Sequence, residues 1–335
     1  MSTRHNRRPL PLAPSSALFL ALVLGTPAPA NAQAIETVGA RALGMGGAFV
    51  AVANDSTATW WNPAGLAVGP FVDLTVSGGR APDTMPPEST ARATTWGLAA
   101  AMPAFGASYY RLRITDIDPV DPIVAAGAGR QEGQGGALPE SLGIGQFGAT
   151  IVHSIFQRLH AGATFKLVHA TAEDGLEADA SGSHFDVDVG LLGLVGPVRI
   201  GVAARQLAEP VLWSDPASGR DLRLGRQVRL GVAFDGELLG ADRARPLVVS
   251  LDADILSYDT IGGSRRMVAV GAERWWRLRR FGLRGGARVN TTGEHEGAAS
   301  VGASISIVKG VQAEVHATAG AEAERGWGVA ARASF

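Results

Sequence analysis

The fold is decided by a pattern seen most clearly in HFDVDVGL (residues 184–191), LVVSLDADI (residues 247–255) and VQAEVHAT (residues 311–318). In each stretch, apolar side chains alternate with charged, polar or small ones. A period of two residues places alternate side chains on opposite faces of a β-strand, whereas a helix would repeat near every 3.6 residues. Each stretch therefore predicts a strand with one apolar and one polar face.

The same alternation recurs along the chain in about 14 segments, and bacterial single-chain outer-membrane barrels have an even number of strands. The segments are long enough for the roughly 9–11 residues that a tilted strand needs to cross the hydrocarbon of a bilayer. The predicted strands begin near Phe71, Arg92, Phe105, Ser141, Leu159, His184, Val198, Leu224, Leu247, Arg265, Phe281, Ala298, Val311 and Arg325. We therefore predict an all-β fold, a transmembrane antiparallel β-barrel.

The connections between these segments alternate in length, as short periplasmic turns and longer outside loops do in such barrels. Tight turns are expected at residues 103–104, 157–158, 196–197, 276–280 and 309–310, and longer stretches lie between them. Residues 235–245 break the rule because a short turn is expected there. Either a strand is misplaced at this point, or the turn carries an insertion.

The polar faces are predicted to line the lumen. An arginine such as Arg284 or Arg288 on the lipid face would cost about 2–4 kcal/mol near the midplane. Inside the barrel these cations can pair with Asp186, Asp188, Asp252, Asp254, Glu273 and Glu314. A soluble β-protein would instead turn its apolar faces inward, but open soluble sheets rarely exceed about ten strands without splitting.

The N-terminal residues predict export. Arg4, Arg7 and Arg8 precede an apolar run at residues 17–25 and two A-x-A cleavage motifs, at residues 30–32 and 32–34. This order is typical of a secretory signal peptide, here residues 1–32, whereas the alternative is an uncleaved amphipathic tail. We expect the mature protein in the outer membrane of a Gram-negative cell.

The partners expected from the sequence are the lipid bilayer of the outer membrane and the outer-membrane assembly machinery. The latter would recognise the last strand, whose alternating apolar face ends at Phe335. A hydrophobic small molecule or a secreted protein is a further candidate. With 30 basic and 31 acidic residues, the chain offers no electrostatic reason to bind nucleic acid.

A different signal lies in residues 39–67, GARALGMGGAFVAVANDSTATWWNPAGLA. This block, with its NPAG motif, resembles the N-terminal signature of the FadL/PorV superfamily of outer-membrane barrels, and the later strands resemble that family too. The resemblance implies a 14-stranded barrel (residues 70–335) with an N-terminal plug (residues 33–69) in its lumen. Small residues of mixed polarity suit such a plug.

Four residues of this block are the candidate functional positions: Arg41, Asp55, Asn62 and Pro63. They are candidates for holding the plug or for lining a ligand path, and holding the plug is the simpler role. The glycines at residues 44–47 could also be a phosphate loop, but no strand precedes them and no lysine follows them.

The two branches of the superfamily imply different functions. PorV/PorQ-type members are accessory barrels for protein secretion and surface attachment. FadL-type members take up hydrophobic molecules such as long-chain fatty acids and release them through the barrel wall. The sequence favours the first because the chain is short and lacks two long apolar loops, although residues 116–139 form one apolar, glycine-rich candidate loop. The FadL-like uptake channel is the alternative.

We expect no enzymatic activity, no cofactor and no metal. His153 and Ser154 are adjacent, so their side chains would point to opposite faces of one strand. The histidines show no ligand spacing such as HExxH. Trp275 and Trp276 are expected in an aromatic girdle at the membrane interface, and the pair at residues 60–61 in the packing of the plug.

Overall fold

The computed structural model describes residues 31–32, 37–81, 92–116, 141–173, 180–214, 221–236, 246–260, 263–293, 297–320 and 325–335. Nearly all of the predicted signal peptide, and the candidate loop after Asp116, lie outside the described residues.

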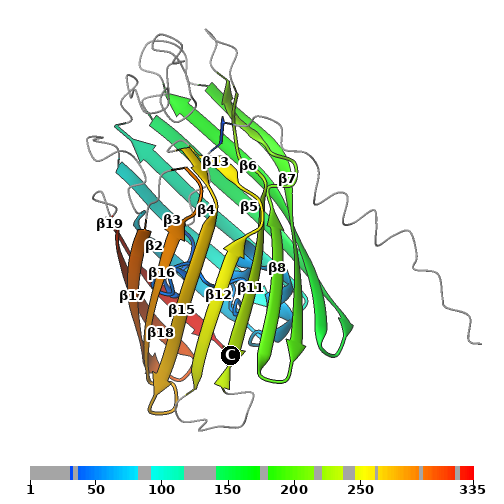
Figure 1. The fold of residues 1–335 in the computed structure, drawn as a ribbon, viewed down its shortest axis with the longest axis vertical. Helices are drawn as coiled ribbons and strands as arrows, with labels where there is room; N and C mark the ends of the chain where they lie inside the picture. Colours follow the sequence, from blue (N-terminus) through cyan, green and yellow to red (C-terminus); the bar gives the residue numbers. More distant parts are fainter. Residues whose placement is uncertain are drawn as a thin grey trace, which may run out of the picture.

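Fourteen strands of the described chain close into one antiparallel barrel (Figure 1). In order around the wall they are β2 (Asp73–Arg80), β3 (Arg92–Met102), β4 (Phe105–Thr115), β5 (Ser141–Phe156), β6 (Leu159–Glu173), β7 (Ala180–Val195), β8 (Val198–Arg205), β11 (Gln227–Asp235), β12 (Leu247–Asp254), β15 (Met267–Trp276), β16 (Phe281–Asn290), β17 (Gly297–Val308), β18 (Val311–Gly320) and β19 (Arg325–Ser334). The ring closes where β19 pairs with β2. The predicted fold class is confirmed, and the strands begin at or within a few residues of the predicted starts.

The unusual connection near residues 235–245 does not hide a misplaced strand. β11 and β12 pair directly, with Asp235 opposite Val248 and Arg229 opposite Asp254. The long turn is therefore an insertion between two neighbouring strands, and residues 237–245 lie outside the described chain.

The wall has the inverted polarity of a membrane barrel. Val232, Leu251 and Val270 stand side by side on β11, β12 and β15 and are exposed on the outer surface. The neighbouring inward residues of β12, Ser250 and Asp252, are almost completely buried. Because apolar side chains face outward and polar ones inward, the outer face is suited to lipid rather than water.

The lumen holds residues 37–69, which we call the plug segment. It contains two short helices, α2 (Ala40–Gly44) and α3 (Ala58–Trp61), and the 3₁₀ helix η1 (Pro63–Val68). None of the described helices is long and apolar enough to cross a membrane.

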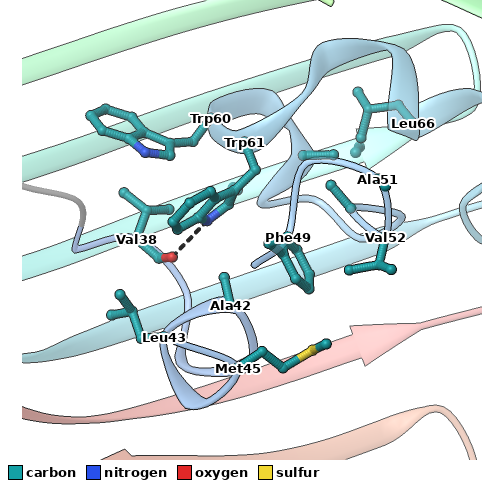
Figure 2. Packing of buried hydrophobic residues seen from close by; sticks show 14 of the residues in the cluster. Val38, Ala42, Leu43, Met45, Phe49, Ala51, Val52, Trp60, Trp61 and Leu66 are labelled. Carbon is teal, nitrogen blue, oxygen red and sulfur yellow. Dashed lines mark hydrogen bonds between the residues drawn. The ribbon is translucent and has the colours of Figure 1, made fainter. Parts of the chain in front are cut away.

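The plug segment has an apolar core of its own (Figure 2). Trp61 is fully buried at its centre, edge-on to Phe49, and its indole N–H donates to the Val38 carbonyl at 2.9 Å. Trp60 packs edge-on against Tyr110 of the wall. Both tryptophans thus lie in the packing of the plug, as the sequence predicts.

Two small additions extend the barrel at the long-loop end. β9 (Val211–Ser214) and β10 (Asp221–Arg223) pair with each other, and β1 (Asn31–Ala32) adds to β10 in parallel. β13 (Tyr258–Thr260) and β14 (Gly263–Arg265) form a separate hairpin. β9 packs against β6 and β7, so this small sheet lies over one side of the lumen.

We expect Leu251→Arg to lower the free energy of unfolding by about 2–4 kcal/mol in lipid vesicles, because the guanidinium would face hydrocarbon. Urea unfolding followed by tryptophan fluorescence measures this. Leu251→Phe, which stays apolar, is the matched control and should remain close to the wild type. Equal stability of the arginine variant and the wild type would show that this face does not contact lipid.

Candidate functional site

Arg41 joins the plug segment to the wall. From α2 its Nη2 reaches Glu273 Oε2 on β15 at 2.7 Å, and its Nε donates to Glu273 Oε1 at 3.0 Å. Its Nη1 donates to Asn54 Oδ1 at 2.7 Å and to Asp55 Oδ2 at 3.1 Å. The fork of the guanidinium thus binds one wall carboxylate in a bidentate manner and one plug carboxylate at the same time.

Asp55 connects the plug segment to the seam of the barrel. Its carboxylate accepts the backbone N–H and the hydroxyl of Thr57, and it lies 3.7 Å from Arg332 Nη1 on β19. Arg332 in turn binds Asp73 of β2 at 2.7 Å. Burial alone would raise the pKa of the Asp55 carboxyl, but Arg332 and Arg41 hold it below its usual value. This contribution to stability is present at neutral pH and is lost only as the pH falls through the lowered pKa.

Asn62 and Pro63 hold the other side of the plug segment. The Asn62 amide donates to the Val50 carbonyl at 2.9 Å and to the Leu191 carbonyl of β7 at 3.1 Å, and its Oδ1 accepts Ala64 N–H. Pro63 starts η1, where its missing N–H is no loss. Sequence reasoning singled out these four residues, and the structure places all four at contacts between plug and wall or at the turns that form them.

Glycines in the wall make room for the plug backbone. A Cβ at Gly190 would lie 2.1 Å from Asn62 Oδ1, and one at Gly286 would lie 2.2 Å from the Met45 carbonyl carbon. These positions face inward on β7 and β16. A side chain there would push the plug segment away from the wall.

Asp252 is a contact that the sequence did not single out as a site. Its Oδ2 accepts the backbone N–H groups of Phe49 at 2.8 Å and Val50 at 2.7 Å. The alternation on β12 predicts that Asp252 faces the lumen, but only the position of the plug backbone shows which groups it binds.

Lumen charges pair with one another, and Arg284 lies 3.6 Å from Glu273 and 3.5 Å from Glu314 as predicted, whereas Asp186, Asp188 and Asp254 pair with cations that were not predicted. Lys166 lies between Asp186 and Asp188, at 2.8 and 2.7 Å. Arg229 binds Asp254 on the next strand at 2.6 Å. These pairs join wall strands and do not involve the plug segment.

The lumen is not polar throughout, which corrects the sequence prediction of a polar interior. At the long-loop end the inward faces of β3 to β6 carry apolar residues, covered partly by residues of β9 and β10. This mouth cluster consists of Ala81, Ala93, Leu112, Ile114, Leu142, Ile144, Val168, Ala170, Ala172, Leu212, Leu222 and Leu224. At this level the alternation is reversed, because apolar side chains such as Leu112 and Ile114 face inward while Arg111 and Arg113 face outward, so the rule of polar residues inside does not hold there.

The mouth cluster leads toward the plug core along β4. Ile114 and Leu112 belong to the mouth cluster, and Tyr110, the next inward residue, packs on Trp60 of the plug. Tyr110 also shares a hydrogen bond of 2.9 Å with Thr59. An apolar surface thus extends from the mouth to the plug on this side of the lumen.

A small pocket lies between the plug segment and the seam where β19 meets β2. Thr37, Ala40 and Leu43 line it from the plug. Gly78 and Gly79 of β2 stand opposite Val329 and Gly328 of β19, and all four line the pocket on the wall side. The pocket therefore reaches the wall where its strands carry little side-chain bulk.

The structure agrees with one detail of the sequence interpretation and changes another. His153 and Ser154 are consecutive on β5 and do not pair, and Ser154 instead bonds His160 of β6, with 2.8 Å between Oγ and Nδ1. Trp276 faces outward as expected, but Trp275 is buried in the lumen, because consecutive residues of a strand point to opposite faces. Among the described residues, no group of histidine, aspartate and glutamate could hold a metal ion.

Three similar solved structures are hydrophobic-solute channels by description. The CymD monoaromatic hydrocarbon channel matches with a TM-score of 0.61 and 11% identity, over 90% of this chain and 99% of that one. The toluene transporter TbuX of Ralstonia pickettii matches at 0.57 and 11%, with the same coverage. The toluene transporter TodX of P. putida matches at 0.54 and 10%, again with the same coverage.

The TM-scores over nearly the full lengths show a shared fold, and at such low identities they show the fold alone. No known family model and no curated protein matches the sequence.

We expect Arg41→Gln and Glu273→Gln each to destabilise the barrel by up to about 3–5 kcal/mol, because each removes the nearest partner of a buried charge and leaves only Asp55 near Arg41 or Arg284 near Glu273. The double variant should lose less stability than the two single variants added together. The difference is the coupling energy of this double-mutant cycle, and it should be about 0.5–3 kcal/mol. Urea unfolding in vesicles measures the cycle, and protease cleavage within residues 37–69 reports release of the plug.

The matched control is the same cycle on Arg229 and Asp254, which joins two wall strands. That cycle should destabilise the barrel without exposing the plug segment to protease. Additive effects at Arg41 and Glu273 would contradict a direct interaction.

We expect Asn62→Ala to loosen the plug segment and to increase leakage of a large antibiotic such as vancomycin across the outer membrane. The variant loses two hydrogen bonds to backbone carbonyls, one of them in the wall. Growth inhibition of expressing cells measures the leakage. Asn290→Ala is the control, because Asn290 is a buried asparagine that bonds Arg266 and Ser264 instead of the plug. Leakage of Asn62→Ala at the wild-type level would show that Asn62 does not anchor the plug.

Proposed function

We propose that this protein is an outer-membrane channel that admits hydrophobic small molecules, with monoaromatic hydrocarbons as the leading substrate class. It would reach the membrane through the predicted signal peptide and the assembly machinery that recognises the strand ending at Phe335. The proposal follows the FadL-like alternative rather than the secretion-accessory function favoured by the sequence.

The observation that carries the proposal is the mouth cluster. A barrel that served only as a rigid partner-binding platform has no need for an apolar surface inside its mouth. Small hydrocarbons bind by burial of apolar area, at about 25 cal/mol per Å². The inward leucine, isoleucine and valine side chains of β4 to β6 are packed against Leu212, Leu222 and Leu224, so they would offer that area to a solute arriving from outside once these leucines move aside.

The path past the mouth is also consistent with an uncharged solute. Tyr110 and Trp60 continue the apolar surface to the plug segment. The charged contacts of Arg41 and Asp55 are already satisfied within the protein, so they are poorly placed to capture a substrate carboxylate.

The similar solved structures also favour a channel over a secretion accessory. The three channels described above carry monoaromatic hydrocarbons by their descriptions. None of them is described as a secretion component, so they give no support to the accessory function.

The proposal is tested by uptake of radiolabelled toluene, and separately of oleate, in a Gram-negative host without its own channels of this type. Toluene uptake should exceed that of the empty host. The double variant Ile144→Thr, Val168→Thr places two hydroxyls in the mouth cluster and should weaken solute binding by about 1–3 kcal/mol, which lowers uptake at least about fivefold.

The matched control is Val301→Thr, Ile305→Thr, which makes the same two exchanges on the outward face of β17. It should retain wild-type uptake if it is assembled to the same level. Toluene and oleate uptake no faster than in the empty host would overturn the channel proposal, and oleate uptake alone would move the substrate class to fatty acids.

A further inference from the structure

The turn between β15 and β16 has an unusual sequence, RWWRLRRF at residues 274–281. It carries Arg274, Arg277, Arg279 and Arg280, and all four side chains are exposed. Leu278 at its tip is 80% exposed. The turn lies at the short-turn end of the barrel, at the bottom of Figure 1.

The turn is held in a fixed and unfavourable conformation. Arg277, Leu278 and Arg279 have φ values of 51°, 56° and 64°, a left-handed region that non-glycine residues rarely enter. The Arg280 N–H donates to the Trp276 carbonyl at 3.0 Å. Ser306 at the end of β17 donates to the carbonyls of Arg279 and Arg280, both at 2.9 Å. The arginines are therefore displayed from a rigid base rather than from a loose loop.

Two of the arginines lie against aromatic rings on the outer face. Arg274 lies 5.6 Å from the centre of the Trp276 ring, and Arg277 lies 5.9 Å from that of Phe281. Trp276 and Phe281 are paired across the strands. A cation on an aromatic ring at the edge of an apolar band is placed at the level of lipid headgroups.

The electrostatic surroundings favour an anion. At this end, the described acidic residues Asp73 and Asp235 are already paired with Arg332 and Arg199. Arg274, Arg277 and Arg280 form no ion pair with any residue that the structure describes. The sequence of the neighbouring turn, residues 237–245, adds two acidic and two basic residues, and so no net charge.

We propose that this turn binds the phosphate of an anionic phospholipid in the leaflet at the short-turn end of the barrel. Guanidinium groups bind phosphate oxygens through paired N–H donors, and Arg274, Arg277 and Arg280 offer three such forks. The acyl chains would lie along Trp276, Phe281 and Leu283, which face outward on the adjoining strands. The inference rests on the bilayer location in the proposed function but not on transport.

The test uses the full-length protein in detergent with added phosphatidylglycerol or phosphatidylcholine, and native mass spectrometry counts the lipids that remain bound. The wild type should retain phosphatidylglycerol in preference. The triple variant Arg274→Gln, Arg277→Gln, Arg280→Gln should retain it at least tenfold less. The control removes three exposed arginines at the opposite end, Arg92→Gln, Arg111→Gln, Arg113→Gln, and should behave as the wild type.

Equal loss in both triple variants would overturn the inference, because it would reflect total charge rather than this site. Equal retention of the two lipids by the wild type would overturn it as well. Release of phosphatidylglycerol by millimolar inorganic phosphate would show a simple anion site instead of a lipid site. The toluene assay separates the two proposals, since lipid retention without uptake leaves this inference standing and removes the channel.

Discussion

The structure depends on the pairing of buried charges inside a barrel whose apolar side chains face outward. The bidentate contact of Arg41 with Glu273 is the central example, because it neutralises a wall carboxylate with a cation from the plug. A buried charge without a partner would cost several kcal/mol. Glu273 is thus shared between Arg41 of the plug and Arg284 of the wall, so the plug segment completes a charge network that begins in the wall.

This constraint explains why the plug is attached differently on its two sides. Toward β12, β15 and β19 it is held by Asp252, Glu273 and Arg332, which bind charged or backbone groups. Toward β6 and β7 it lies against glycines, where Asn62 and the following proline fit closely. Glycines such as Gly271 and Gly286 admit the plug backbone on the first side as well, so the charged contacts are what distinguishes it from the second.

The sequence was sufficient to predict the strands of the wall. A period of two residues determines each strand and its two faces, and the short turns determine which strands are neighbours. It also located the plug contacts at Arg41, Asp55 and Asn62, through a resemblance rather than through spacing. It could not identify Asp252 as a plug ligand, since the acceptor of Phe49 and Val50 lies about two hundred residues away and only the fold brings them together.

The mouth cluster was missed for a related reason. On β4 the residues near the long loops still alternate, but with apolar Leu112 and Ile114 inside and Arg111 and Arg113 outside, so a rule that places polar residues in the lumen assigns these faces the wrong way round. Nearer the plug, β6 has polar residues inside and apolar residues outside, as at Thr164 and Lys166. The lumen thus has an apolar upper level and a charged lower level. On the proposed path along β4, a solute would reach the plug at Trp60 and Tyr110, away from the ion pairs of Arg41 but beside Arg205, whose guanidinium lies over the Trp60 ring.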